Sequence, residues 1–113
     1  MPKLYFASPR DLPASRPQPG VTEHVVHGER TTILIIDLDA RTIVETHKHD
    51  VEHVGVVTRG SVAMVIAGEQ RILVAGDTYV IPAGAAHGTR VLEQAAQVVD
   101  VAPVVDVAPA PRA

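Results

Sequence analysis

The sequence predicts a single all-β domain, and three observations lead to that fold class. First, a chain of 113 residues with 46% hydrophobic content is long enough for one domain with its own core and too short for two. Second, from Val21 onward the apolar runs are short and rich in valine and isoleucine, with Gly, Asp, Pro or charged pairs between them. Third, no stretch has helical periodicity. Many short strands imply a sandwich or a closed barrel.

The first twenty residues are expected to form an extended arm. Proline occupies five of these positions, and such a segment supports neither a regular helix nor a central strand. We expect residues 1–20 to lie over the surface or over a neighbouring subunit. Because no stretch resembles a signal peptide or approaches membrane-spanning length, a cytoplasmic protein without membrane association is expected.

Residues 21–102 are expected to form the barrel from nine short strands. In chain order we expect them at Thr22–His27, Thr32–Leu38, Thr42–Thr46, Glu52–Thr58, Val62–Ala67, Gln70–Val74, Thr78–Ile81, His87–Leu92 and Ala96–Ala102. In the runs 33–36 and 62–67, the side chains that point to either face of the strand are apolar, which indicates that both faces of these strands are covered. A homodimer would supply the outer cover.

Residues 103–113 are expected to form a C-terminal tail. The stretch Val98–Pro103 is repeated as Val104–Pro109. The first copy is predicted to be the last strand, and the second is either a frayed extension or a strand given to a partner. The repeat is too short to indicate a solenoid.

Charge and composition narrow the functional classes. The formal net charge is -3, which gives no electrostatic reason to expect nucleic-acid binding. The chain contains no cysteine, so a metal could be held only by nitrogen and oxygen ligands. The six histidines are therefore the first candidates for metal ligands.

Four of these histidines form a predicted metal site. His47, His49 and His53 share parity, so on an extended backbone without a bulge their side chains point into one interior. His87 follows a turn at residues 82–84 that would set it beside the other three. Scattered surface and core histidines are not expected to coincide with such a spacing of glycines and prolines.

Two segments resemble the motifs of the cupin family. Residues 41–60 resemble its histidine-any-histidine motif, which ends in Gly60. The second motif is matched by Gly76, Pro82, Gly84 and His87. The resemblance covers residues 41–91 and implies a double-stranded β-helix, or jelly-roll barrel. It also implies one divalent transition-metal ion per chain, with manganese expected first and iron, nickel, zinc and copper as alternatives.

The match to the cupin motifs has three departures. Arg41 replaces the opening glycine, which would alter one turn, and Val91 replaces an asparagine that hydrogen-bonds in the pocket of some relatives. His53 stands where the family has a glutamate or glutamine ligand.

Four neutral imidazoles leave a divalent ion with a charge of about +2, which favours anionic or chelating oxygen ligands. An octahedral ion would keep two positions open, whereas tetrahedral zinc would be closed and structural.

Three other residues carry weaker predictions. Glu52 would replace His53 as a ligand if a bulge shifted the strand by one residue. Glu45 would sit at the barrel mouth as a general base, as a hydrogen-bond acceptor for a metal ligand, or as a solvated rim carboxylate. Tyr79 is expected to pack rather than to act in catalysis.

Three functions remain open. The four-histidine set resembles small manganese-binding cupins with oxidative activity, which implies an oxygenase or dioxygenase that uses manganese or iron on a small organic substrate. Residues 77–82 and 99–101 also resemble small uronate-processing cupins, which implies non-redox isomerisation or ring closure of a sugar acid with Glu45 as acid or base. The third is a non-enzymatic ligand-binding or sensory module. In each case metal affinity is expected to decrease when the pH drops below about 6 to 6.5, because only neutral imidazoles bind metal.

Overall fold

Ten strands and one short 3-10 helix make up the computed structural model over residues 5–104, the part of the chain that it describes. The elements are η1 (Pro9–Asp11), β1 (Ala14–Gln18), β2 (Val21–His27), β3 (Thr31–Leu38), β4 (Ile43–His47), β5 (His53–Arg59), β6 (Ser61–Ile66), β7 (Glu69–Val74), β8 (Thr78–Ile81), β9 (His87–Val91) and β10 (Ala96–Pro103). All nine predicted strands are present with ends within one residue of those expected. The all-β prediction is confirmed.

The structure differs from the predicted arm at Ala14–Gln18. These residues form β1, which pairs antiparallel with β2, although the register shifts between Ser15 and Gln18. β1 is an edge strand, so Pro17 is tolerated where a central strand would lose a hydrogen bond. The sheet therefore begins before Val21.

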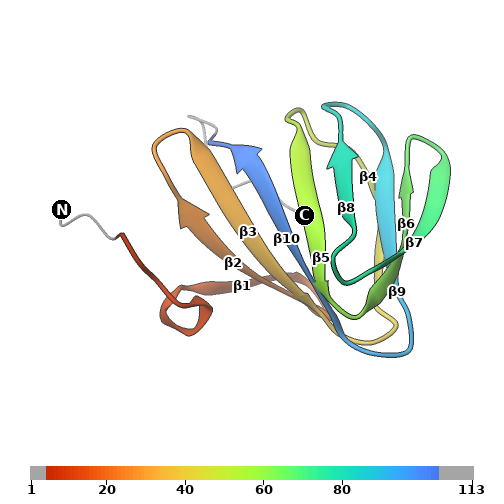
Figure 1. Ribbon diagram of the computed structural model, residues 1–113, viewed down its shortest axis with the longest axis horizontal. Helices are drawn as coiled ribbons and strands as arrows, with labels where there is room; N and C mark the ends of the chain where they lie inside the picture. The colour runs from red at the N-terminus through yellow and green to blue at the C-terminus, as the bar shows by residue number, and fades with distance from the viewer. Residues whose placement is uncertain (1–4, 105–113) are drawn as a thin grey trace.

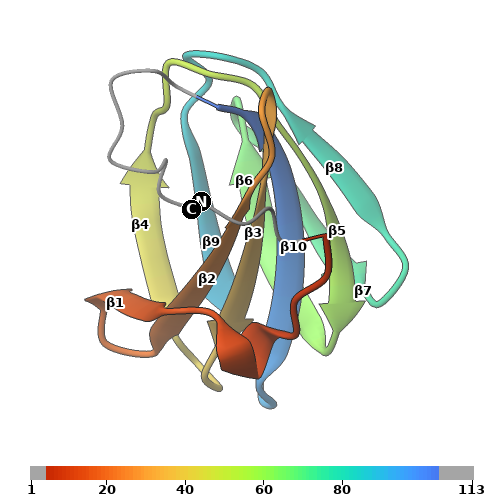
Figure 2. The ribbon, with the colours of Figure 1, turned by 90° about the vertical axis from the view of Figure 1, so that its left-hand side faces the viewer.

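Two antiparallel sheets form the domain. One has the strand order β1-β2-β3-β10-β5-β8 and the other β4-β9-β6-β7. Figure 1 shows β10 between β3 and β5 in the larger sheet, with the four-stranded sheet on the right of the view. Figure 2, turned by 90°, shows β1 beside the lower part of β2.

Alternation of side chains gives the larger sheet an inner and an outer face. In β3, Leu34 and Ile36 are buried whereas Ile33 is 38% exposed, because successive residues of a strand point to opposite faces. The expected cover on both faces of β3 is therefore not provided by the described chain. In β6, by contrast, Ala63 is buried along with its inward neighbours.

Inward residues of both sheets form one hydrophobic core. Its buried members are Val21, Leu34, Ile36, Leu38, Val57, Val62, Met64, Tyr79, Ile81, Val91, Ala96 and Val98. Within residues 5–104, no helix has the length and apolar character needed to cross a membrane.

The C-terminal repeat is described only in part. Its first copy lies in β10, as predicted, and β10 ends at Pro103. The second copy lies outside the described residues from position 105 onward.

Candidate metal centre

His47 and His87 meet across two adjacent strands. β4 ends at His47, β9 begins at His87, and the two residues are direct partners in the antiparallel register. Their ring centroids lie 4.3 Å apart. The strand pairing alone therefore brings two of the predicted ligands into contact.

His49 lies in the loop after β4 and is tied to the turn that precedes β9. The backbone N–H of Gly84 donates a hydrogen bond to the carbonyl oxygen of His49 over 2.7 Å. Gly84 has a φ of 78°, which a glycine adopts without strain. This bond joins the two histidine-bearing segments, and the His49 ring centroid lies 4.7 Å from that of His47 and 4.8 Å from that of His87.

The histidine cluster has dimensions close to those of a metal site. One ring nitrogen from each of His47, His49 and His87 lies within 4.8 Å of the other two. Metal–nitrogen bonds of about 2.1 Å place adjacent ligand nitrogens about 3.0 to 3.4 Å apart, so binding of an ion would draw the three rings closer together. His53 is not in this close group of three, but its ring stacks on His49 with centroids 4.6 Å apart and planes at 7°.

Hydrogen bonds at the Nδ1 atoms define the tautomers of two rings. The Nδ1 atoms of His47 and His87 lie 2.8 Å and 3.0 Å from the carbonyl oxygens of Glu45 and Ala85. A carbonyl oxygen only accepts, so these Nδ1 atoms carry the proton and the Nε2 atoms of the neutral rings keep a lone pair. The Nε2 atoms of His49, His53 and His87 are buried without a hydrogen-bond partner. Buried lone pairs of this kind fit a metal ion.

His53 is oriented by a buried carboxylate. Its Nδ1 lies 3.1 Å from Oδ2 of Asp100, and the Tyr79 hydroxyl donates a short hydrogen bond to the other carboxylate oxygen. All three side chains are buried. A carboxylate behind a ligating imidazole commonly fixes the ring and raises its basicity. Tyr79 thus packs in the core, as expected, and also holds Asp100.

The side chains of His53 and its neighbour Glu52 lie in different environments. The His53 side chain is fully buried, whereas Glu52 is exposed. The pairing of β5 with β8 runs without a shift from His53 opposite Ile81 onward. The bulge that would have replaced His53 by Glu52 is therefore not present.

Glu45 and Glu23 line one pocket of about 310 Å³, here named the mouth pocket, whose residues come from β1, β2 and β4. Gln18 and His47 line the same pocket. Glu45 is exposed, but Glu23 is only 4% exposed because it lies on the inward parity of β2 with Val21. Buried carboxylates are usually paired, and Glu23 does have an interaction partner. Sequence reasoning missed Glu23 because an acidic residue in a strand resembles a solvent-facing position.

A small inner cavity of about 30 Å³ adjoins two of the histidines. His47, His87 and Asp100 line it, together with apolar side chains that include Met64 and Val98. Val44 and His47 also line the mouth pocket. His47 is therefore the member of the cluster that lines both the inner cavity and the mouth pocket.

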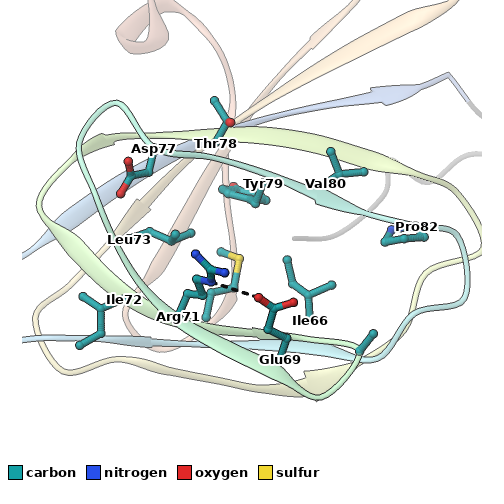
Figure 3. Close-up of a pocket in the computed structure, with 12 residues that line it drawn as sticks. Ile66, Glu69, Arg71, Ile72, Leu73, Asp77, Thr78, Tyr79, Val80 and Pro82 are labelled. Carbon is teal, nitrogen blue, oxygen red and sulfur yellow. Dashed lines mark hydrogen bonds and ion pairs between the residues drawn. The ribbon is translucent and has the colours of Figure 1, made fainter.

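A larger cavity of about 620 Å³ lies elsewhere, between β7 and β8. Figure 3 shows the Arg71–Glu69 ion pair at this cavity, with Tyr79 on its opposite side. No histidine lines it, so this cavity is not the metal centre. Met64 and Tyr79 are shared with the inner cavity and separate the two spaces.

The family comparison agrees with this geometry. Residues 34–102, more than half of the chain, match the cupin domain family. The chain belongs to the cupin family. No curated protein matches this cupin.

Solved cupin structures show the same fold. KdgF from a Halomonas species superposes with a TM-score of 0.83 at 23% identity, covering 93% of this chain and 98% of that one. An RmlC-like cupin from Shewanella frigidimarina has a TM-score of 0.82 at 17% identity, covering 92% and 94%. A variant of oxalate decarboxylase from Bacillus subtilis has a TM-score of 0.75 at 23% identity, covering 86% of this chain but only 28% of that one. At these identities the likeness establishes the fold alone.

Arg41 shows how this cupin accommodates the loss of the family's opening glycine. Arg41 keeps a positive φ of 63°, in the left-handed region where glycine is usual. Its side chain forms only an exposed ion pair with Glu93. Arg41 therefore adopts a backbone conformation that favours glycine.

Burial keeps two of the cluster's imidazoles neutral. The pKa of His49 is lowered from 6.5 to about 4, chiefly because burial disfavours the charged ring, and next because His53, His47 and His87 repel its charge. Burial likewise lowers the pKa of His87, against the opposing effect of the Ala85 carbonyl. For His49 and His87, proton competition with a metal therefore begins at a lower pH than an ordinary histidine would predict.

Stability of the metal-free protein is expected to fall in acid. Between pH 6.5 and about 4, unfolded chains bind a proton at His49 that folded chains do not. The free energy of unfolding therefore decreases as the pH falls through this window and is unaffected by His49 above it. Thermal unfolding measured from pH 8 to 4 tests this. His49→Gln should flatten the decline, and an equally steep decline in that variant would contradict the assignment.

Proposed function

We propose that this cupin is a metal-dependent oxygenase that uses manganese or iron to oxidise a small organic substrate. His47, His49, His53 and His87 would hold the ion through their Nε2 atoms. When bound, such an ion supplies electron transfer between substrate and dioxygen. The protein's own part is to fix the imidazoles, exclude water and position the substrate.

The inner cavity is the observation that carries the proposal. A space of about 30 Å³ is large enough for one or two water-sized molecules, each needing about 10–15 Å³, and too small for an organic substrate. Most of its wall is apolar and includes Ile36, Met64 and Val98, while His47, His87, Thr89 and Asp100 supply the polar part. A small apolar gas such as dioxygen suits this space beside His47 and His87.

The mouth pocket suits the organic substrate. Its volume of about 310 Å³ is within the range of small-molecule sites. Glu23, Glu45 and Gln18 offer hydrogen-bond acceptors in this pocket, which His47 also lines. These groups favour a hydroxylated compound with an anionic or chelating end directed toward the histidines.

Dioxygen consumption tests this function. Protein purified without added metal would be analysed for metal content and by electron paramagnetic resonance, then loaded with manganese or iron. Uptake would be followed with catechols and small 2-hydroxy acids. Met64→Phe should fill the inner cavity and reduce uptake while metal content is retained, and Met64→Leu should retain both. Product formation that continues undiminished without dioxygen would refute the oxygenase.

Glu23 supports a second candidate, non-redox acid-base chemistry on a sugar acid. It is a buried carboxylate on the same pocket as His47, which is the setting in which a proton-transferring group is expected. Glu45, the acid or base expected from the sequence, lines that pocket but is exposed. We therefore assign the proton transfer of this alternative to Glu23.

The two carboxylates can be compared directly. On a panel of uronic acids followed by NMR, Glu23→Gln is expected to lower turnover by about 100-fold or more, with metal content unchanged. Glu45→Gln serves as the matched control and should lower it far less. If Glu45→Gln lowered turnover more than Glu23→Gln, the proton-transferring residue would be Glu45. No turnover of any uronic acid would refute this candidate, and a retained organic acid would then indicate a ligand-binding module.

A further inference from the structure

Strand β7 reverses the usual placement of apolar and charged side chains. Arg71 is directly opposite Met64 of β6, which is a buried core residue, so Arg71 has the inward parity of its strand. Glu69, two residues away, shares that parity. Ile72 and Val74 have the outward parity and are 63% and 53% exposed. Burial of apolar surface would favour the opposite arrangement, so the inner side of β7 requires another explanation.

The inner side of β7 borders the larger cavity of about 620 Å³. β7 and β8 are the last strands of their two sheets and pair with β6 and β5, not with each other. Figure 3 shows Glu69 and Arg71 on the β7 side of this cavity and Tyr79 on the β8 side. The volume lies within the range of about 300–1,000 Å³ that is typical of small-molecule sites. A charged pair therefore lies at a cavity that can hold a small organic molecule.

Apolar side chains form most of the cavity wall. They include Met64, Ile66, Leu73 and Tyr79. Met64 and Tyr79 are buried core residues, and the Tyr79 hydroxyl is already bonded to Asp100. The Tyr79 ring and the Met64 side chain therefore offer the cavity an apolar surface, which favours a ligand with an apolar body.

Arg71 supplies hydrogen-bond donors for the polar end of such a ligand. Its Nε donates to Oε2 of Glu69 over 3.0 Å, and within residues 5–104 its side chain makes no second hydrogen bond or ion pair. The two Nη groups are therefore available to a planar acceptor, and a guanidinium binds a carboxylate through two parallel hydrogen bonds.

Two carboxylates limit the charge that the ligand can carry. Glu69 and Asp77 line the same cavity, and Asp77 accepts a hydrogen bond from the backbone N–H of Val74 through only one of its oxygens. Both carboxylates repel a dianion such as a phosphate monoester more strongly than a monoanion. The charges at the cavity therefore favour a singly charged carboxylate.

We propose that this cavity is a second ligand site, which binds a monocarboxylic acid with an apolar body. The carboxylate pairs with the Nη groups of Arg71, and the apolar body lies against Met64, Leu73 and Tyr79. The site does not depend on the proposed oxygenase, because no histidine lines the cavity. Met64 and Tyr79 also separate it from the inner cavity beside the metal centre. Protein with and without metal should therefore bind the acid equally well.

Methyl NMR of the full chain, titrated with octanoate, tests the site. The methyl resonances of Ile66 and Leu73 should shift with a dissociation constant below about 1 mM. Both residues line this cavity and neither the mouth pocket nor the inner cavity. Val44 lines those other two spaces, so its methyl resonances report on the metal centre and should not shift. Octanol, which lacks the charge, should bind at least about 10-fold more weakly.

Two substitutions on β7 are expected to act in opposite directions. Arg71→Gln should raise the dissociation constant of octanoate by about 10-fold, because it removes a charge-assisted pair at an exposed position. Glu69→Gln should lower it by about 3-fold, because it releases Arg71 from its ion pair and removes a repelling charge. Arg90→Gln is the matched control, since Arg90 is an exposed arginine on β9 that does not line this cavity. This variant should bind octanoate as the wild type does.

Folding of each variant is checked by circular dichroism and cooperative thermal unfolding. If Arg71→Gln fails to fold, Arg71→Lys replaces it and should still weaken binding by about 3-fold, because a lysine lacks the planar pair of donors. The proposal would be overturned if Ile66 and Leu73 showed no saturable shift, or if the shifts were confined to Val44. Equal octanoate affinity in wild type and in a folded Arg71 variant would also overturn it.

Discussion

His53→Ala is expected to lower metal affinity by more than about 100-fold, whereas Glu52→Ala should leave it unchanged. The reason is that His53 is fully buried with an unpartnered Nε2, while its Nδ1 is held by Asp100. Glu52 is exposed and contributes nothing to the cluster. Metal content after dialysis and competition against a chelator would measure the difference.

Asp100→Asn is expected to lower metal affinity by an amount between the effects of His53→Ala and Glu52→Ala. It retains the shape of the side chain but removes the negative charge behind His53, so affinity should fall by about 10- to 100-fold. If Glu52→Ala lost more metal than His53→Ala, the register described for β5 would be wrong. Equal metal content in all three variants would mean that the centre consists of His47, His49 and His87 alone.

Gly55→Ala is expected to destabilise the protein by about 3 kcal/mol or more. A Cβ at this position would lie 2.3 Å from Cζ of Tyr79 and 2.5 Å from Oδ1 of Asp100. The side chains of Tyr79 and Asp100 are buried and hydrogen-bonded to each other, so neither can move away without disturbing the contact that orients His53. Glycine is therefore required here by close approach rather than by an unusual φ.

Chemical denaturation would measure this effect, with Gly68→Ala as the control. Gly68 has a positive φ of 85° but open space around its Cβ position, so that substitution should cost only about 1–2 kcal/mol of backbone strain. If Gly55→Ala cost no more than Gly68→Ala, the packing of Tyr79 against Asp100 would be looser than described.

The strand pattern was predictable because its physical cause is local. Short apolar runs bounded by turn residues determined nine strands to within one residue. β1 was missed because Pro17 argues against a strand unless the strand is known to be at an edge. Edge position is a property of the assembled sheet.

The histidine cluster was also predictable in part. His47, His49 and His87 come together as expected, and His53 stacks beside them. Parity alone did not account for this, because His49 lies in a loop and is placed by the Gly84 hydrogen bond. Glu23 and Asp100 were not singled out, since nothing local distinguishes a buried carboxylate from a solvated one.

By itself, the sequence determined the all-β class, the strand order along the chain and the four histidines as the candidate ligands. Only the tertiary structure decided which carboxylates face the interior and that Gly55 must leave room for Tyr79 and Asp100. It also decided that Ile33, Val54, Val80 and Val101 form one outer row. The physical reason is that strand formation depends on neighbours in the chain, whereas burial, register and close approach depend on residues far apart in it.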